Sequence, residues 1–214
     1  MRQLNHSFSQ KPVCYADSGK DLGGLKSEII RKSIHFLIAL IPGIAAINKT
    51  IAIAILITGI LSYTIMEYLR FCGVKIPVIS SLTRIASRPH DIGRFVMGPV
   101  TLGLGALIAL VLFPFPAAVI AIYALAFGDG ISSLAGMFFG KLRPVFLFGK
   151  SIEGSLACFT AVLISVYIVC GSIHIAIVAA FTAMVVEALP LGDYDNFAIP
   201  VTVGLAVHFV SAAF

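Results

Sequence analysis

Seven long apolar runs occupy most of this 214-residue chain and constrain its fold more than any other feature. A helix needs about 20 apolar residues to cross a bilayer core. Only 12% of the residues are charged, about half of the share in an ordinary soluble domain. The sequence therefore predicts an all-α, polytopic integral membrane protein with about seven transmembrane helices, and excludes a soluble domain. The predicted spans are Ser33–Ile47, Ile51–Met66, Phe95–Phe113, Phe115–Phe139, Ser155–Ile173, His174–Leu189 and Phe197–Phe214.

The distribution of Lys and Arg between the runs predicts the orientation. The N-terminal segment carries six of them, the second connection five and the fourth connection three. The first connection carries one, and the other connections carry none. Basic residues accumulate in the cytoplasmic loops of membrane proteins. We therefore expect the N-terminus to lie in the cytoplasm.

The acidic side chains follow the same predicted orientation, and none falls on the outer side. Near the inner ends of the spans, or in a cytoplasmic connection, lie Glu67, Asp129, Glu153, Glu187, Asp193 and Asp195. A proton or ion pathway would place carboxylates along the depth of the membrane. The one-sided distribution therefore favours a membrane enzyme with a cytoplasmic substrate over a transporter. Carboxylates without partners at an interface also indicate a divalent cation.

The fourth span contains an acidic residue between two glycines, Gly128-Asp129-Gly130. A carboxylate inside an apolar run is costly, and flanking glycines loosen a helix and let a ligand approach its backbone. We predict that the span is interrupted here and that Asp129, with freed backbone amides, holds Mg²⁺ and phosphate. A helix break with Asp129 as its cap is the alternative.

The segment Gly149-Lys150-Ser151 matches only the last three residues of a Walker A phosphate-binding loop. Walker A loops carry another Gly five residues earlier and follow a strand, and both features are missing here. Lys150 can still meet a phosphate as a point charge. Ser151 and Glu153 also indicate a helix start, with Ser151 or Ser155 near the N-cap. Both interpretations are compatible, because a helix N-terminus favours phosphate.

Two further polar groups flank the apolar core. Arg31, Lys32 and His35 open the first predicted span, where Arg31 and His35 share a helix face. His35 is either an ordinary interfacial residue or a contact to phosphate or to an acceptor hydroxyl. Glu187 precedes a connection that contains Asp195 and Asn196. That connection is either a divalent-ion loop or a solvated turn.

In combination these motifs resemble an integral membrane lipid kinase family, that of polyprenol/dolichol kinase, phytol kinase and CTP-dependent diacylglycerol kinase, over residues 28–200. The central motifs are also similar to CDP-diacylglycerol synthase, but that enzyme's long Asp-rich C-terminal signature is missing. The matching pieces are Arg31-Lys32-x-x-His35, Gly128-Asp129-Gly130-x-x-Ser133-x-x-Gly136-x-x-x-Gly140-Lys141, Lys150-Ser151-x-Glu153-Gly154-Ser155, Glu187, and Asp195-Asn196 with Pro200.

The resemblance implies transfer of the γ-phosphate of a nucleoside triphosphate, with CTP as donor, to the hydroxyl of a lipid alcohol such as polyprenol, phytol or diacylglycerol. It implies Mg²⁺ as the cofactor, held by Asp129, Glu187 and Asp195. Glu153, Glu187 and His35 all remain candidates for the general base. The expected catalytic residues are Asp129, Lys141, Lys150, Glu153, Glu187 and His35. The expected nucleotide-binding residues are Arg31, Lys32, Gly128, Gly130, Ser133, Gly140, Ser151 and Asn196.

We accordingly expect residues 1–30 to form a cytoplasmic segment and residues 31–214 a transmembrane catalytic domain. Its active site would face the cytoplasm, in the plasma (inner) membrane if the source is prokaryotic. A cytidylyltransferase that makes a CDP-lipid and a small lipid transporter are the competing hypotheses. No nucleic-acid partner is expected. The glycines of the third span pack either inside the protein or against a second copy in a homodimer.

Overall fold

The computed structural model describes residues 22–74 and 94–213, and these residues are all helical apart from short connections. The predicted all-α class is confirmed for them. Most of the predicted N-terminal segment, residues 1–30, lies outside the described residues. The α-helices are α1 (Leu22–Leu37), α2 (Ile41–Ile47), α3 (Lys49–Phe71), α5 (Gly98–Leu112), α6 (Phe115–Tyr123), α7 (Gly130–Phe139), α8 (Ile152–Cys170), α9 (Ile173–Glu187) and α10 (Asp195–Ala213).

Several helices have the length and apolarity of membrane spans. The four that are long and apolar enough to cross a bilayer are Gly24–Ile47, Lys49–Phe71, Phe115–Phe139 and Ile152–Cys170. Two shorter apolar helices, α5 and α9, accompany them. The chain is therefore a membrane protein by the character of its helices, whereas the count of seven spans and the cytoplasmic N-terminus stay predictions. The first helix starts well before the predicted Ser33, so that Lys32 and its neighbours lie inside it.

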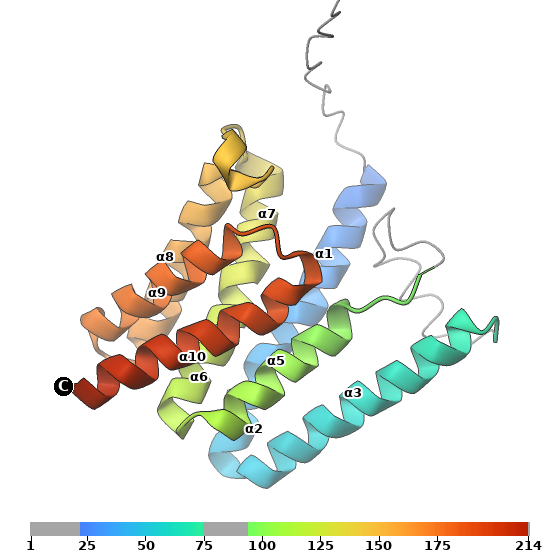
Figure 1. Ribbon diagram of the computed structural model, residues 1–214, viewed down its shortest axis with the longest axis horizontal. Helices are drawn as coiled ribbons and strands as arrows, with labels where there is room; N and C mark the ends of the chain where they lie inside the picture. The colour runs from blue at the N-terminus through green and yellow to red at the C-terminus, as the bar shows by residue number, and fades with distance from the viewer. Residues whose placement is uncertain (1–21, 75–93, 214) are drawn as a thin grey trace, which may run out of the picture.

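The helix Phe115–Phe139 is the centre of the bundle (Figure 1). In its most apolar stretch 72% of the residues are buried, against 17–33% in the other three candidate spans. It consists of α6, a π-helical turn, η3 (Ala124–Asp129), and α7. Together these parts contact α1, α5, α8, α9 and α10. Asp129 and Ser133 therefore lie on the most enclosed of the four candidate spans.

The remaining helices surround this centre in a continuous series. Along the series α3 packs on α5, α5 on α10, α10 on α9, and α9 on α8, while α8 and α1 both pack on α7 of the central helix. In Figure 1, α3 lies at one edge of the bundle and α8 with α9 at the other. The end of α9, the start of α10 and the start of α8 thereby come close to the central helix.

The predicted interruption of the fourth span takes the form of a π-helical turn that ends at Asp129, so the helix is widened and not broken. Both glycines beside it permit close packing. A Cβ on Gly130 would lie 2.6 Å from the ring of Phe36 on α1. A Cβ on Gly128 would lie 3.0 Å from Val162 on α8. Such π-turns recur at functional sites because they redirect the side chains that follow.

Gly105 of α5 is expected to be essential for stability, because its Cα faces the backbone of α10. A Cβ at this position would lie 2.1 Å from the carbonyl oxygen of Asn196. Gly105→Ala should therefore destabilise the protein by about 1–3 kcal/mol, measured as thermal unfolding in detergent. Gly59→Ala on α3 is the matched control, since no atom lies within 4 Å of its Cβ position. Equal melting temperatures of the two variants would contradict this packing.

Candidate active site

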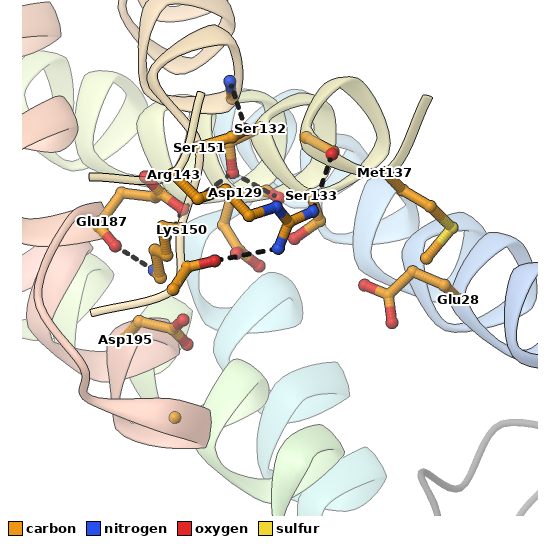
Figure 2. A pocket seen from close by; sticks show the side chains of 14 residues that line it. Glu28, Asp129, Ser132, Ser133, Met137, Arg143, Lys150, Ser151, Glu187 and Asp195 are labelled. Atoms are coloured by element: carbon orange, nitrogen blue, oxygen red, sulfur yellow. Dashed lines mark hydrogen bonds and ion pairs between the residues drawn. The ribbon is translucent and has the colours of Figure 1, made fainter. Parts of the chain in front are cut away.

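A polar cavity of about 340 Å³ lies between α1, α7, the α7–α8 connection, the end of α9 and the start of α10. Figure 2 shows its lining side chains converging from these separate elements. The lining is unusually charged for a bundle of apolar helices. Its ionisable side chains are Glu28, Asp129, Arg143, Lys150, Glu187 and Asp195.

Two side chains of α1 contact the carboxylate of Asp129. The Nζ atom of Lys32 donates to Oδ2 of Asp129 at 2.5 Å, and Lys32 is only 1% exposed. The Nε2 atom of His35 lies 3.3 Å from the same oxygen and 3.0 Å from the carbonyl oxygen of Leu125. Because both neighbours accept, Nε2 carries a proton. Asp129 makes no side-chain cap hydrogen bond, so its role is not that of a helix cap.

This arrangement leaves Asp129 one oxygen for a ligand. Lys32 and His35 both engage Oδ2, and the residue lines the cavity. Oδ1 is therefore the atom that can contact a metal or a phosphate-bound group. A single carboxylate oxygen per side chain is an ordinary mode of Mg²⁺ binding.

Glu187 and Lys150 form a second charged pair across the cavity. The Nζ atom of Lys150 lies 3.0 Å from Oε1 of Glu187 and also donates to the Glu187 carbonyl oxygen. The hydroxyl of Ser132 donates to Oε1 at 3.2 Å. The other oxygen, Oε2, is buried and has no hydrogen-bond partner among residues 22–74 and 94–213. A buried carboxylate oxygen without a partner is costly, which points to a ligand at this position.

The connection between α7 and α8 is fixed by its own hydrogen bonds. Ser151 accepts from the amide of Gly154 at 3.1 Å, which confirms the predicted helix start with Ser151 as N-cap. Glu153 accepts from the amides of Lys141 and Leu142 at 3.0 and 3.2 Å. Lys141 and Glu153 thus shape the connection and do not line the cavity.

Arg143 brings a second basic side chain into the cavity. Its guanidinium donates to the carbonyl oxygens of Gly149, at 2.9 Å, and Gly136, at 3.3 Å. These two bonds tie the connection to the end of α7 and hold the cation beside Lys150 in the lining. Two adjacent basic groups at the start of a helix suit a polyphosphate.

The start of α10 contributes Asp195, whereas its neighbour Asn196 points elsewhere. Asp195 lines the cavity ahead of the apolar part of α10, and burial raises its pKa, with a smaller contribution from the Asp129 carboxylate. Asn196 donates to the hydroxyl of Thr101, at 3.1 Å, and to the carbonyl oxygen of Gly98. Asn196 therefore joins α10 to α5 and lies outside the cavity lining.

The structure brings six of the predicted site residues to the cavity and leaves the others outside its lining. Lys32 and His35 contact Asp129 from α1, and the glycines pack against neighbouring groups. The six are Asp129, Ser133, Lys150, Ser151, Glu187 and Asp195. Outside the lining are Arg31, Lys32, His35, Gly128, Gly130, Gly140, Lys141, Glu153 and Asn196.

Sequence reasoning missed Glu28 and Arg143. Glu28 was assigned to the cytoplasmic segment because the first helix was predicted to start at Ser33. Its spacing of three from Arg31, which indicates a helical ion pair, was the available signal. Arg143 was counted only as a loop charge that sets orientation, and its spacing from Lys150 carries no motif.

A metal ion would need more than the side chains at this site. Within residues 22–74 and 94–213, no group of three or more His, Cys, Asp or Glu side chains is close enough to hold one. Mg²⁺ commonly binds through one or two carboxylates together with substrate phosphates and water. The unpartnered Oε2 of Glu187 and the carboxylate of Asp195 fit that mode.

These features define a helical membrane protein with a charged cavity beside the second half of its central helix. No family model and no solved structure matches the chain. The chain is 26% identical over 186 residues to an uncharacterized protein of Methanocaldococcus jannaschii, an alignment that covers 85% of this chain and 93% of that protein.

A second relative carries a functional name. Over 151 residues the chain is 27% identical to a protein of Triticum aestivum named "Probable phytol kinase, chloroplastic". The alignment covers 62% of this chain and 49% of the plant protein, so the chain spans about half of that relative's length. The relation is distant and partial, and it agrees with the kinase family that the motifs resemble.

The buried pair between Lys32 and Asp129 predicts a stability coupling. Lys32→Met leaves a buried carboxylate without its direct ion-pair partner and should cost about 3–5 kcal/mol. Adding Asp129→Asn should restore part of that loss, because the uncompensated charge disappears. Unfolding of the single and double variants in detergent gives the coupling energy. Lys49→Met, at the exposed start of α3, is the control, and strictly additive losses would contradict the coupling.

Proposed function

We propose that this protein is a membrane lipid kinase. It transfers the γ-phosphoryl group of a nucleoside triphosphate, with CTP as the donor, to the hydroxyl of a lipid alcohol of the polyprenol, phytol or diacylglycerol type. The observation that carries the proposal is the charged cavity, in which carboxylates and basic groups meet inside a bundle of apolar helices. The distant relation to a protein named as a phytol kinase supports the same class.

The cavity has the two kinds of groups that phosphoryl transfer requires. The transferred group needs positioning and neutralisation of its charge more than covalent chemistry. Lys150 and Arg143 are the basic side chains of the lining and would contact the phosphate oxygens. The hydroxyl groups of Ser133 and Ser151 would hydrogen-bond to them, at a helix N-terminus that itself favours phosphate.

Mg²⁺ would be held by one or two of the carboxylates of Asp129, Glu187 and Asp195, with the triphosphate and water completing its ligands. When bound, it supplies charge neutralisation on the phosphate oxygens. Lys32 and His35 hold Oδ2 of Asp129, so that Oδ1 would be the oxygen left for Mg²⁺. His35 is thereby a positioning residue in this proposal, because its Nε2 proton is shared between Asp129 and Leu125.

The choice of CTP and the cytoplasmic side have separate supports. CTP follows from the resemblance of the central motifs to CTP-using lipid enzymes. The cytoplasmic side follows from the excess of Lys and Arg in the N-terminal segment, the second connection and the fourth connection. The α7–α8 connection, which is the fourth, forms one wall of the cavity, so the cavity opens on the predicted inner side.

A product assay tests the function directly. Purified protein in detergent receives Mg²⁺, CTP or ATP radiolabelled on the γ-phosphate, and phytol, polyprenol or diacylglycerol. We expect label in the organic phase, release of the nucleoside diphosphate, and loss of both on removal of Mg²⁺ by EDTA. Pyrophosphate release with phosphatidic acid would instead identify a cytidylyltransferase. No transfer under either condition would contradict an enzyme of this class.

Asp195 is expected to set the requirement for Mg²⁺. Asp195→Asn removes a carboxylate from the cavity and should raise the Mg²⁺ concentration for half-maximal activity by about 10–100-fold, the range for changes around metal ligands. Asp193→Asn is the matched control, two residues away and outside the lining. Identical Mg²⁺ titrations of Asp195→Asn and the wild type would contradict the assignment.

A further inference from the structure

Glu28 lies at one end of the cavity and has no role in the proposed phosphate and Mg²⁺ contacts. Figure 2 shows Glu28 and Met137 together on one side, and Lys150, Glu187 and Asp195 on the other, with Asp129 between them. Glu28 is buried, at 8% exposure, although it is a carboxylate in the first turns of α1. The cavity therefore has a second acidic end, separate from the Lys150 end.

Arg31 holds the Glu28 carboxylate in a fixed orientation. Its Nη2 and Nε atoms donate to the two carboxylate oxygens at 2.6 and 3.2 Å, the forked geometry that gives strong and well-oriented pairs. The Nη1 atom of Arg31 also lies 3.9 Å from Oδ1 of Asp193. Arg31 thereby connects α1 to the segment before α10. A carboxylate braced in this way is positioned before any ligand arrives.

The surroundings of Glu28 are the apolar side of the cavity. Met137 is the one apolar side chain, glycines aside, among the described residues that line it. Next to these two residues in sequence, Ile29 and Phe138 are 41% and 45% exposed. They belong to the candidate spans Gly24–Ile47 and Phe115–Phe139. In a membrane, exposed side chains on these helices face acyl chains. The Glu28 end of the cavity thus adjoins the apolar phase, where a lipid alcohol resides.

We propose that Glu28 is the catalytic carboxylate that receives the proton of the acceptor alcohol, an inference that rests on the proposed kinase function. The lipid hydroxyl would enter on the α1–α7 side and donate a hydrogen bond to Glu28. Its oxygen forms a bond to the γ-phosphorus while the bond from that phosphorus to the β-phosphate oxygen breaks. The hydroxyl proton passes to Glu28 and later to water, and the nucleoside diphosphate leaves with the bonding electron pair.

The other candidate bases are less suited to this role. Glu187 is tied to Lys150 at the opposite end of the cavity. Glu153 accepts two backbone amides and lies outside the lining, as does His35. The loose transition state of phosphoryl transfer demands orientation of the hydroxyl more than basicity, and a braced carboxylate provides orientation.

The test replaces Glu28 by Gln, which has the same size and keeps one oxygen that can accept from Arg31. We expect Glu28→Gln to lower kcat for transfer to phytol or diacylglycerol by about 100-fold or more. The KM for CTP and the melting temperature should stay unchanged, because the phosphate end and the fold are intact. Glu28→Asp, which restores a carboxylate, should recover part of the rate.

Glu67→Gln on α3 is the matched control. Glu67 makes the same forked pair with Arg70, at 2.6 and 2.7 Å and the same spacing of three, but does not line the cavity. The folded control should turn over like the wild type. Wild-type kcat in Glu28→Gln, or a rise in the KM for CTP together with a lower melting temperature, would overturn the catalytic role. Inactive wild-type protein with every donor and alcohol would instead contradict the proposed kinase function itself.

Discussion

The buried ion pair between Lys32 and Asp129 is the interaction on which the rest of the site depends. Burying either charge without the other would be too costly. The Nζ atom of Lys32 lies 2.5 Å from Oδ2 of Asp129, and this contact joins α1 to the central helix. His35 adds a bond to the carbonyl of Leu125 within the π-turn. The turn, the first helix and the acidic residue therefore form one unit. Because that unit consumes Oδ2 of Asp129, it also determines which oxygen a ligand can reach.

Small residues let the polar parts meet around this unit. Phe36 can lie against α7 only because Gly130 has no side chain, and Ser151 lies against Gly136 and Gly140 for the same reason. The second contact brings the start of α8 and its N-cap to the end of the central helix. Close packing at the glycines and the buried ion pair thus both bring neighbouring helices to the central helix. The glycines that the sequence suggests as ligand contacts have a packing role in the structure, because side chains of other helices lie directly against them.

The helical class and much of the cavity could be predicted from the sequence, because apolar length and residue type are local properties. The apolar runs identify the helices, and the spacing around Ser151 correctly predicts the start of α8. The start of the first helix was predicted too late. Its charged residues appeared to require water, yet Lys32 finds its partner 97 positions away. Pairing across such a distance leaves no local pattern. Glu28 differs, because its spacing of three from Arg31 is a local signal of a helical ion pair.

The carboxylates of the cavity differ in how many of their oxygens are paired with protein groups. This difference makes the two ends of the cavity chemically unlike. Asp129 is paired on one oxygen, and Glu187 leaves one buried oxygen without a partner. Glu187 lies at the Lys150 end and Asp129 lies between the two ends, where cation and phosphate charges would compensate them. Glu28 is bonded on both oxygens by Arg31 and borders the apolar side. Because Arg31 already balances its charge, Glu28 can accept a hydrogen bond from a neutral donor. A hydroxyl group on an apolar chain is such a donor, so the polarity of the cavity matches a charged donor at one end and a lipid acceptor at the other.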